Sequence, residues 1–289
     1  MDLRSSLPYA GMFVLYIAVV GLALYLVVPF ADAGMEVSDA PEDPSNTLVF
    51  VGLVLAMTAG MIAAMKFDFD FVVRVGVLFS VGVLSFYVAS AFLPDVAGVA
   101  VAGVVVLSLY VHPEWYVVDG AGVLVGAGGA AIFGISLSPL PAVLLLGLLA
   151  VYDAVAVYRT KHMLTLADGV MEMRLPVLFV VPRSLDYSFL EHEAVEDDDR
   201  DALYMGLGDA VIPTVLAASA LRFLDAPLAV NHAAQGAVVG GFLGFAFLML
   251  LVSRGKPHAG LPLLNGGSIA GFFLGALAMG STPLEALGL

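Results

Sequence analysis

Two aspartates, Asp153 and Asp209, lie inside long apolar segments of the chain. An ionisable side chain inside an apolar span is costly, so it is a functional candidate by default. No Lys or Arg lies near either aspartate within its own segment. Two carboxylates in one low-dielectric site cannot both ionise easily, and they share a proton. The ionised member can then activate a water while the protonated member polarises a carbonyl, which is the chemistry of aspartic proteolysis.

The same two aspartates are compatible with other functions. A carboxylate pair can bind a proton or a coupling ion in a secondary transporter, and this is the main alternative. The pair can also be structural, with each carboxyl group hydrogen-bonded to backbone inside a non-catalytic membrane scaffold. Residue types alone leave all three interpretations open.

The chain has the composition of a membrane protein. Of its 289 residues, 61% are hydrophobic and only 12% are charged, whereas a soluble domain carries about 25% charged residues. A membrane-spanning helix needs about 20 apolar residues. We therefore expect an all-α polytopic membrane protein, with residues 1–289 forming a single membrane domain of nine transmembrane helices. The expected spans are Tyr9–Phe30, Thr47–Met65, Phe71–Leu93, Val96–Val111, Trp115–Leu137, Ala142–Arg159, Ala202–Leu221, Leu228–Val252 and Leu261–Gly280.

The two aspartates are expected at the same depth in the bilayer. Asp153 lies seven residues before Thr160, where the sixth span ends, and Asp209 lies seven residues after Ala202, where the seventh begins. At a rise of 1.5 Å per residue, each would lie roughly 10 Å from the same membrane surface. Consecutive antiparallel helices could therefore bring the two carboxyl groups face to face.

The distribution of Lys and Arg sets the expected orientation. With nine spans, ten of the eleven basic residues fall on one side of the membrane and only Arg222 falls on the other. Because cytoplasmic loops are enriched in Lys and Arg, we predict a cell-membrane protein with a cytoplasmic N-terminus and an extracellular C-terminus. Residues 9–159 then hold six helices, 160–201 form a cytoplasmic loop and 202–280 hold three helices. The ten residues are Arg4, Lys66, Arg74, Arg159, Lys161, Arg174, Arg183, Arg200, Arg254 and Lys256.

The cytoplasmic loop and the start of the fifth span contain further features. Leu175–Val181 is β-branched and aromatic and is bounded by prolines, which predicts a short strand. Glu191–Asp201 is an acidic run that we expect to be disordered. Asp119 follows Trp115 and Tyr116, and we expect it at the membrane interface.

Three short motifs resemble those of a known family. Tyr152-Asp153 is similar to its YD motif, Gly206-Leu207-Gly208-Asp209 to its GxGD motif, and Pro262-Leu263-Leu264 to its Pro-Ala-Leu motif, with Leu263 in place of the alanine. Together, in the sixth, seventh and ninth spans, they resemble the presenilin and signal peptide peptidase family of intramembrane aspartyl proteases. The resemblance implies nine spans, catalytic Asp153 and Asp209, and hydrolysis of peptide bonds within transmembrane segments. The inside N-terminus and compact loop resemble an archaeal-type presenilin homologue.

The motif residues have expected roles beside the aspartates. Gly206 and Gly208 lack side chains, so backbone or substrate can approach Asp209 closely; either glycine alone could equally serve helix packing. Tyr152 borders the site or packs as an ordinary aromatic residue. Pro262 shapes the entry to the last span or is an ordinary helix-start proline. The other motif residues expected to shape the site are Leu207, Leu263 and Leu264.

The predicted strand Leu175–Val181 suggests how a substrate is held. A transmembrane helix hides its peptide bonds in its own hydrogen bonds, so it must unwind before attack. A strand near the site could pair with the unwound segment, as the family resemblance also implies. The alternative is that this stretch lies on the membrane surface.

Composition excludes several partners and cofactors. The formal charge of −14 argues against a nucleic-acid partner. The absence of cysteine excludes thiolate catalysis and Cys-ligated metals. The five histidines are scattered without metal-ligand spacing, so we expect no metal and no cofactor beyond water. The expected partners are transmembrane-helix peptide substrates, membrane lipid and further copies of the chain in a homo-oligomer.

Overall fold

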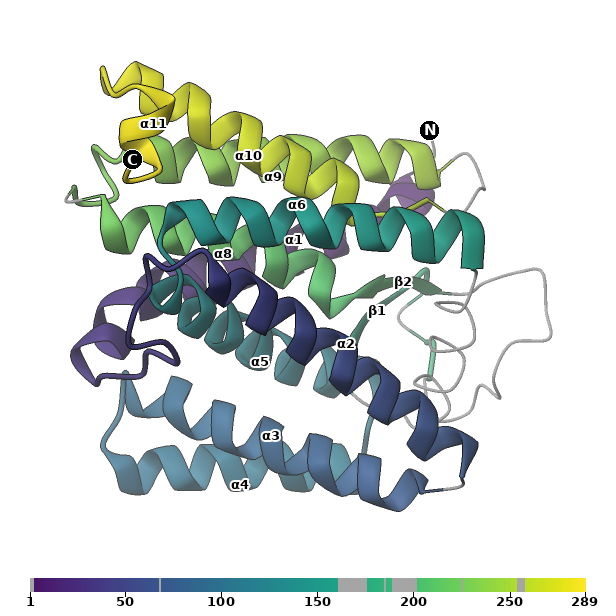
Figure 1. The fold of residues 1–289 in the computed structure, drawn as a ribbon. Coiled ribbons are helices and arrows are strands. Elements are labelled where there is room, and N and C mark those ends of the chain that lie inside the picture. Colours follow the sequence, from purple (N-terminus) through teal and green to yellow (C-terminus); the bar gives the residue numbers. More distant parts are fainter. Residues whose placement is uncertain are drawn as a thin grey trace.

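The computed structural model describes residues 3–67, 69–160, 176–184, 186–188, 202–224, 226–253 and 258–289, and its architecture is a helical bundle (Figure 1). Within these residues, nine helices of 17 to 30 residues run back and forth between the two ends of the bundle. They are α1 (Leu3–Asp32), α2 (Ser45–Lys66), α3 (Asp70–Ser90), α4 (Asp95–Val111), α5 (Trp115–Ser136), α6 (Pro139–Val155), α8 (Leu207–Phe223), α9 (His232–Val252) and α10 (Leu261–Ala278). A short α11 (Pro283–Ala286) follows.

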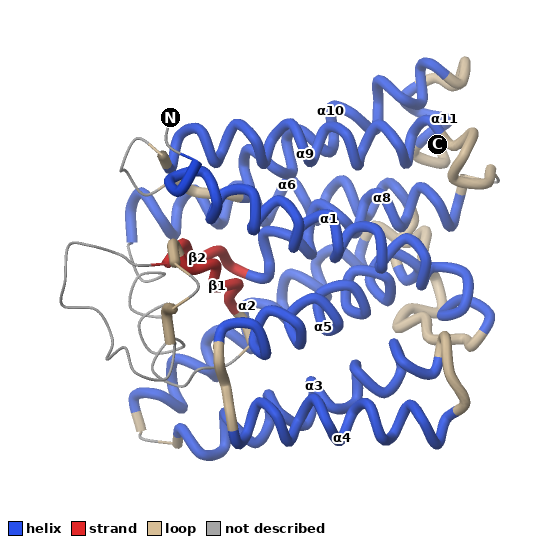
Figure 2. Tube along the Cα trace, turned by 180° about the vertical axis from the view of Figure 1, so that it is seen from behind, coloured by secondary structure: helices blue, strands red, loops and turns tan. Residues whose placement is uncertain are grey.

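The helices are those of a multi-pass membrane protein. Seven of the helical segments in the described residues are long and apolar enough to cross a bilayer, and α4 is a shorter apolar helix. The predicted all-α polytopic fold is thus confirmed. Because α4 and α8 have only 17 residues each, the count of nine spans remains a prediction. The two ends of the chain lie at opposite ends of the bundle (Figure 2).

A two-stranded sheet lies at the end of the bundle that also holds the N-terminus (Figures 1 and 2). Strand β1 (Leu178–Pro182) pairs antiparallel with β2 (Ala202–Gly206), with Phe179 opposite Met205. A strand in this region was predicted, although the observed strand begins three residues later than expected. Leu175 and the acidic run Glu191–Asp201 lie outside the described residues, as does most of the loop 160–201.

The start of the seventh predicted span was wrong. Ala202–Gly206 is β2, and helix begins only at Leu207. Short apolar runs do not distinguish a buried strand from a helix, and here pairing with β1 decides between them. Asp209 therefore lies in the first turn of α8, and the calculation of equal depth from two helical segments of seven residues does not hold. The sixth span reaches Arg159 as expected, but its last turn is π-helical: α6 ends at Val155 and η1 (Ala156–Thr160) follows it.

Helix α8 lies at the centre of the bundle and is packed against α1, α5, α6, α9 and α10. Small residues allow this crowding: a side chain at Gly134 of α5 would collide with Ala218 of α8. Helices α9 and α10 approach so closely that a methyl group at Gly240 would overlap the backbone of Gly267. Close helix contacts of this kind are typical of membrane bundles, where packing replaces the hydrophobic effect. The central position of α8 sets its first turn, in which Ala210 is buried and Gly208 is exposed, among the surrounding helices.

Candidate active site

Asp153 lies in the last turn of α6, where it is buried. Its Oδ2 accepts a hydrogen bond of 3.1 Å from the backbone N–H of Leu261, and a second backbone hydrogen bond comes from Gly260. Gly260 is the residue that caps the start of α10 and Leu261 is the first residue of that helix. The beginning of α10 therefore holds the Asp153 carboxyl group through backbone donors.

The carboxyl group of Asp209 also lies close to the start of α10. It interacts electrostatically with Asp153. A methyl group built at Gly260 would lie 3.0 Å from the Cγ, the Oδ1 and the Oδ2 of Asp209, so the carboxyl group rests against the Cα of this glycine. The two carboxyl groups thus converge on one backbone segment, Gly260–Leu261, although they come from different helices. This convergence was expected from the sequence, but the segment that mediates it was not.

Helix N-termini take the place of counterions at the site. Among the described residues, no Lys or Arg forms an ion pair with either aspartate. Asp153 accepts from the N-terminus of α10, and Asp209 lies in the first turn of α8. The unpaired N–H groups and the positive end of the helix dipole stabilise negative charge at both places. This arrangement explains how two acidic groups are accommodated inside an apolar bundle.

The other residues expected at the site differ in how closely they approach the carboxyl groups. A methyl group at Gly206 would lie 3.6 Å from the Asp209 Oδ2, whereas one at Gly208 would point into open space. The start of α10 brings Pro262 and its neighbours directly after the Gly260–Leu261 contact. Tyr152, which precedes Asp153, is half-buried near the end of α6. The remaining motif residues are the partly exposed Leu207 and Leu263 and the buried Leu264, whose backbone packs on Gly244 of α9.

Three residues near the site were missed or misjudged from the sequence. Gly260 lies between the two carboxyl groups. In the sequence, the feature that pointed to it was its position two residues before Pro262. Tyr16 of α1 is buried and interacts electrostatically with Asp209. Asp119 was expected at the membrane interface, but it is only 4% exposed and its Oδ1 accepts a hydrogen bond of 2.8 Å from the N–H of Val180. The sheet therefore covers Asp119 on α5, which the sequence did not indicate, and its place at the membrane interface stays a prediction.

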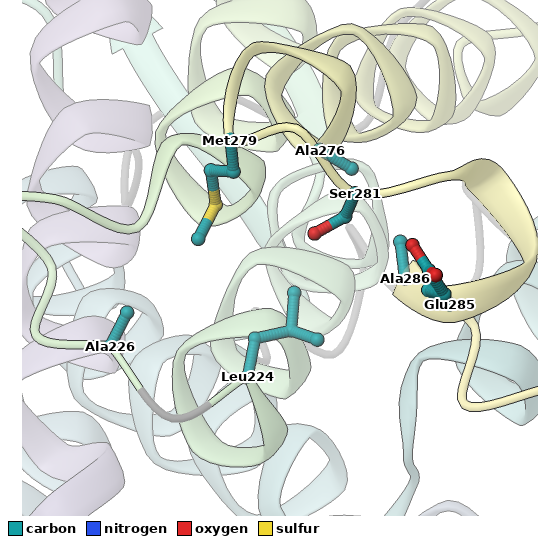
Figure 3. Close-up of a pocket in the computed structure, with 7 residues that line it drawn as sticks. All are labelled: Leu224, Ala226, Ala276, Met279, Ser281, Glu285 and Ala286. Carbon is teal, nitrogen blue, oxygen red and sulfur yellow. The ribbon is translucent and has the colours of Figure 1, made fainter.

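The described residues contain no cluster of three or more His, Cys, Asp or Glu side chains that could hold a metal ion. One cavity lies at the opposite end of the bundle from the sheet, between α8, α10 and α11 (Figure 3). Glu285, the acidic residue in its lining, already forms the capping hydrogen bonds of α11. The cavity is lined by Leu224, Ala226, Ala276, Met279, Ser281, Glu285 and Ala286, and it is separate from the aspartate site.

A membrane-spanning bundle with two converging carboxyl groups defines the class of intramembrane aspartyl proteases. Comparison with known proteins agrees: the family model described as signal-peptide peptidase, presenilin aspartyl protease matches residues 11–281. The chain belongs to this family. It is an aspartic endopeptidase of membranes, and nothing in the comparisons supports the transporter alternative.

Two solved structures are similar over almost the whole chain. A presenilin family intramembrane aspartate protease in space group C222 is 35% identical, with a TM-score of 0.72, and the match covers 94% of this chain and all of the other. A second structure, of a presenilin family intramembrane aspartate protease in space group P2, is 37% identical, with a TM-score of 0.64, and the match covers 94% of this chain and 98% of the other. No curated protein matched.

Proposed function

We propose that Asp153 and Asp209 are the catalytic pair with which this protease hydrolyses peptide bonds inside transmembrane segments. The observation that carries the assignment is the convergence of both carboxyl groups on Gly260–Leu261. Two acidic groups that interact electrostatically without a basic partner among the described residues are suited to share one proton. The matching motifs and the family membership support the same assignment.

The reaction follows from this shared proton. The ionised carboxylate takes a proton from a water, whose oxygen then bonds to the scissile carbonyl carbon, while the protonated carboxyl group hydrogen-bonds the carbonyl oxygen. The resulting tetrahedral intermediate collapses as the C–N bond breaks. A proton passes from the pair to the leaving nitrogen, so that one water is consumed and the pair returns to its original protonation. The carboxylates act as one unit in every step.

The sheet offers a place for the unwound substrate. In an antiparallel pair, successive residues direct their backbone groups alternately toward the partner strand and away from it. Because Val180 donates to Asp119 and not to β2, its opposite residue Tyr204 directs its own N–H and C=O away from β1. Gly206 lies two residues after Tyr204 on β2, so it also directs its backbone groups away from β1. The outer edge of β2 therefore leads toward Asp209. An extended segment that adds to this edge would bring its peptide bonds to the catalytic pair.

The proposed orientation places the sheet and the aspartates nearer the cytoplasmic side. Lys66 is in the last turn of α2 and Arg159 in that of η1, and both elements end at the end of the bundle that holds the N-terminus (Figure 1). Arg222 lies in the last turn of α8, at the opposite end. Because the chain lacks cysteine, a single cysteine introduced at Ser38 should react with an impermeant reagent outside the cell, whereas one at Arg183 should not. The reverse labelling would overturn the orientation.

Cleavage of a single-span reporter peptide by the purified protein tests the catalytic assignment. Asp153→Asn and Asp209→Asn are each expected to lower kcat by at least about 10³-fold, and the double variant should be little worse, because the residues of a catalytic unit are not additive. Asp95→Asn, at an exposed acid that starts α4, is the matched control and should cleave at the parent rate. Retained cleavage in either active-site variant, with folding intact, would overturn the assignment.

A further inference from the structure

One face of α5 forms the surface on which the sheet is docked. Asp119, Gly122 and Gly126 follow the spacing of a single helix face. Asp119 accepts the hydrogen bond from Val180. At Gly122 a methyl group would lie 2.9 Å from the Phe179 ring, so β1 packs directly on the helix backbone there.

The same face continues onto the start of α8. At Gly126 a methyl group would lie 3.0 Å from Leu207, the first residue of α8. The α5 face therefore supports β1, and one turn further on it supports the junction that leads to Asp209. The glycines provide close approach, but only Asp119 supplies a directional contact that fixes the position of the sheet along the helix.

The Asp119 contact also satisfies a backbone donor that has no strand to pair with. The N–H of Val180 points away from β2, and Val180 is only 1% exposed, so water cannot replace an acceptor there. Two residues further along the same edge, Pro182 has no N–H to satisfy. On β1 the carboxyl group of Asp119 thus takes the role that a third strand would have.

We propose that Asp119 is a positioning residue for proteolysis: by accepting the Val180 N–H it anchors β1 on α5, and through β1 it fixes the register in which β2 presents a substrate strand beside Asp209. The inference rests on the proposed catalytic pair and goes beyond it. Asp119 itself touches neither the substrate nor the reacting atoms. Its effect on the reaction passes through the Val180 hydrogen bond and the β1–β2 ladder, in which Val180 lies opposite Tyr204.

Three single variants and one double variant separate this role from a general effect on folding. Asp119→Asn keeps an acceptor oxygen in the same place and is expected to cleave within about threefold of the parent rate. Asp119→Leu has similar size but no acceptor, and the buried N–H that it leaves unpaired should lower kcat/KM by at least about tenfold. Val180→Pro removes the donor instead. Replacing both partners leaves no unpaired group, so the double variant Asp119→Leu/Val180→Pro should be no slower than Asp119→Leu alone.

The positions of the cuts give a second readout. Mass spectrometry of the reporter fragments should show additional cleavage sites with Asp119→Leu, because a loosely anchored sheet allows the substrate strand to slip in register. Asp119→Asn should retain the parent pattern, as should Asp95→Leu, the control at an exposed acid. A general loss of stability would reduce the amount of active enzyme without moving the cuts. If leucine prevents folding, Asp119→Ala supplies the same comparison.

Three results would overturn the proposal: equal behaviour of Asp119→Asn and Asp119→Leu, an unchanged cut pattern in Asp119→Leu, or additive losses in the double variant. These results are distinguishable from failure of the catalytic assignment. If Asp153→Asn and Asp209→Asn abolish cleavage while the Asp119 variants cleave as the parent does, only the positioning role is lost. If the Asp153 and Asp209 variants still cleave, the catalytic assignment fails first.

Discussion

Replacing Gly260 with alanine tests the geometry of the site by adding a single methyl group. The new carbon would lie 3.0 Å from three atoms of the Asp209 carboxyl group, whereas non-bonded heavy atoms prefer separations of about 3.5–4.0 Å. Relief therefore requires a movement of roughly 0.5 Å. Gly260 has φ −79° and ψ −49°, a conformation that alanine adopts without strain. Any effect must consequently come from the contact with Asp209 and not from the backbone.

The size of the effect follows from the sensitivity of catalysis to position. A displacement of about 1 Å at a reacting group can cost about 10²-fold in rate, so half that displacement corresponds to about tenfold. In free energy this is about 1.4 kcal/mol of transition-state stabilisation. We therefore expect Gly260→Ala to lower kcat for the single-span reporter about tenfold. KM should change little, because the methyl group faces the carboxyl group and not the free edge of β2.

The matched control for this variant lies on the same helix. At Gly266 of α10 an added methyl group meets no protein atom within 4 Å. Gly266→Ala should therefore cleave at the parent rate and raise helix stability by roughly 0.5–1 kcal/mol, because glycine is unfavourable inside a helix. Parent-like cleavage by Gly260→Ala, measured beside this control, would refute the reasoning: it would mean that the Asp209 carboxyl group does not rest against residue 260 in the working enzyme.

Further predictions concern the support of the site and the stability of the bundle. Gly122→Ala should lower reporter cleavage several-fold by pushing β1 away from α5, while Gly120→Ala, where an added methyl group meets open space, should not. Gly240→Ala should destabilise the protein by about 3 kcal/mol or more, seen as a lower midpoint of thermal unfolding in detergent, because its methyl group would overlap backbone that cannot move aside. The capping hydrogen bonds from the N-cap threonine hold the pKa of Glu285 below its usual value. A lowered folded-state pKa contributes stability at neutral pH that is lost as the pH falls through it. Hydrogen exchange in α11 should therefore increase below about pH 4, and Glu285→Gln should remove that dependence.

Much of the fold was predictable from hydropathy, because a bilayer demands long apolar helices. The two aspartates were also predictable, since an acid inside an apolar span stands out from its surroundings. Hydropathy did not reveal that the seventh predicted span begins as β2, because a short apolar run such as Ala202–Gly206 is compatible with either a strand or a helix. The distinction depends on pairing with β1, which is far away along the chain. Long-range pairing of this kind leaves no local trace in the periodicity.

Two site residues were not predictable for a different reason. Gly260 has no functional side chain that a sequence search could single out. Its backbone contacts the Asp153 carboxyl group, and because it lacks a side chain the Asp209 carboxyl group can approach it closely. Asp119 carries a chemical group, but its neighbours Trp115 and Tyr116 are typical of a membrane interface, so the sequence predicted an interfacial position and gave no sign of a contact with the sheet. Only the sheet, which covers it, shows that the carboxyl group is buried and paired with backbone.

The places where regular structure breaks are the places where the site is built. Asp153 precedes the π-helical turn that follows α6, Asp209 follows the end of β2, and Gly260 precedes α10. Backbone that is not part of a regular helix must find other hydrogen-bond partners inside a membrane protein. Here the start of α10 donates to Asp153, and the N–H of Val180, which faces away from β2, donates to Asp119. The outer edge of β2 differs, because no described backbone segment pairs with it. Backbone groups left unpaired in a membrane protein are costly, and an unwound substrate strand that pairs with the edge of β2 would satisfy both partners. The same irregular backbone that hydropathy cannot detect thus provides the donors that hold the carboxyl groups and the edge to which we propose the substrate adds.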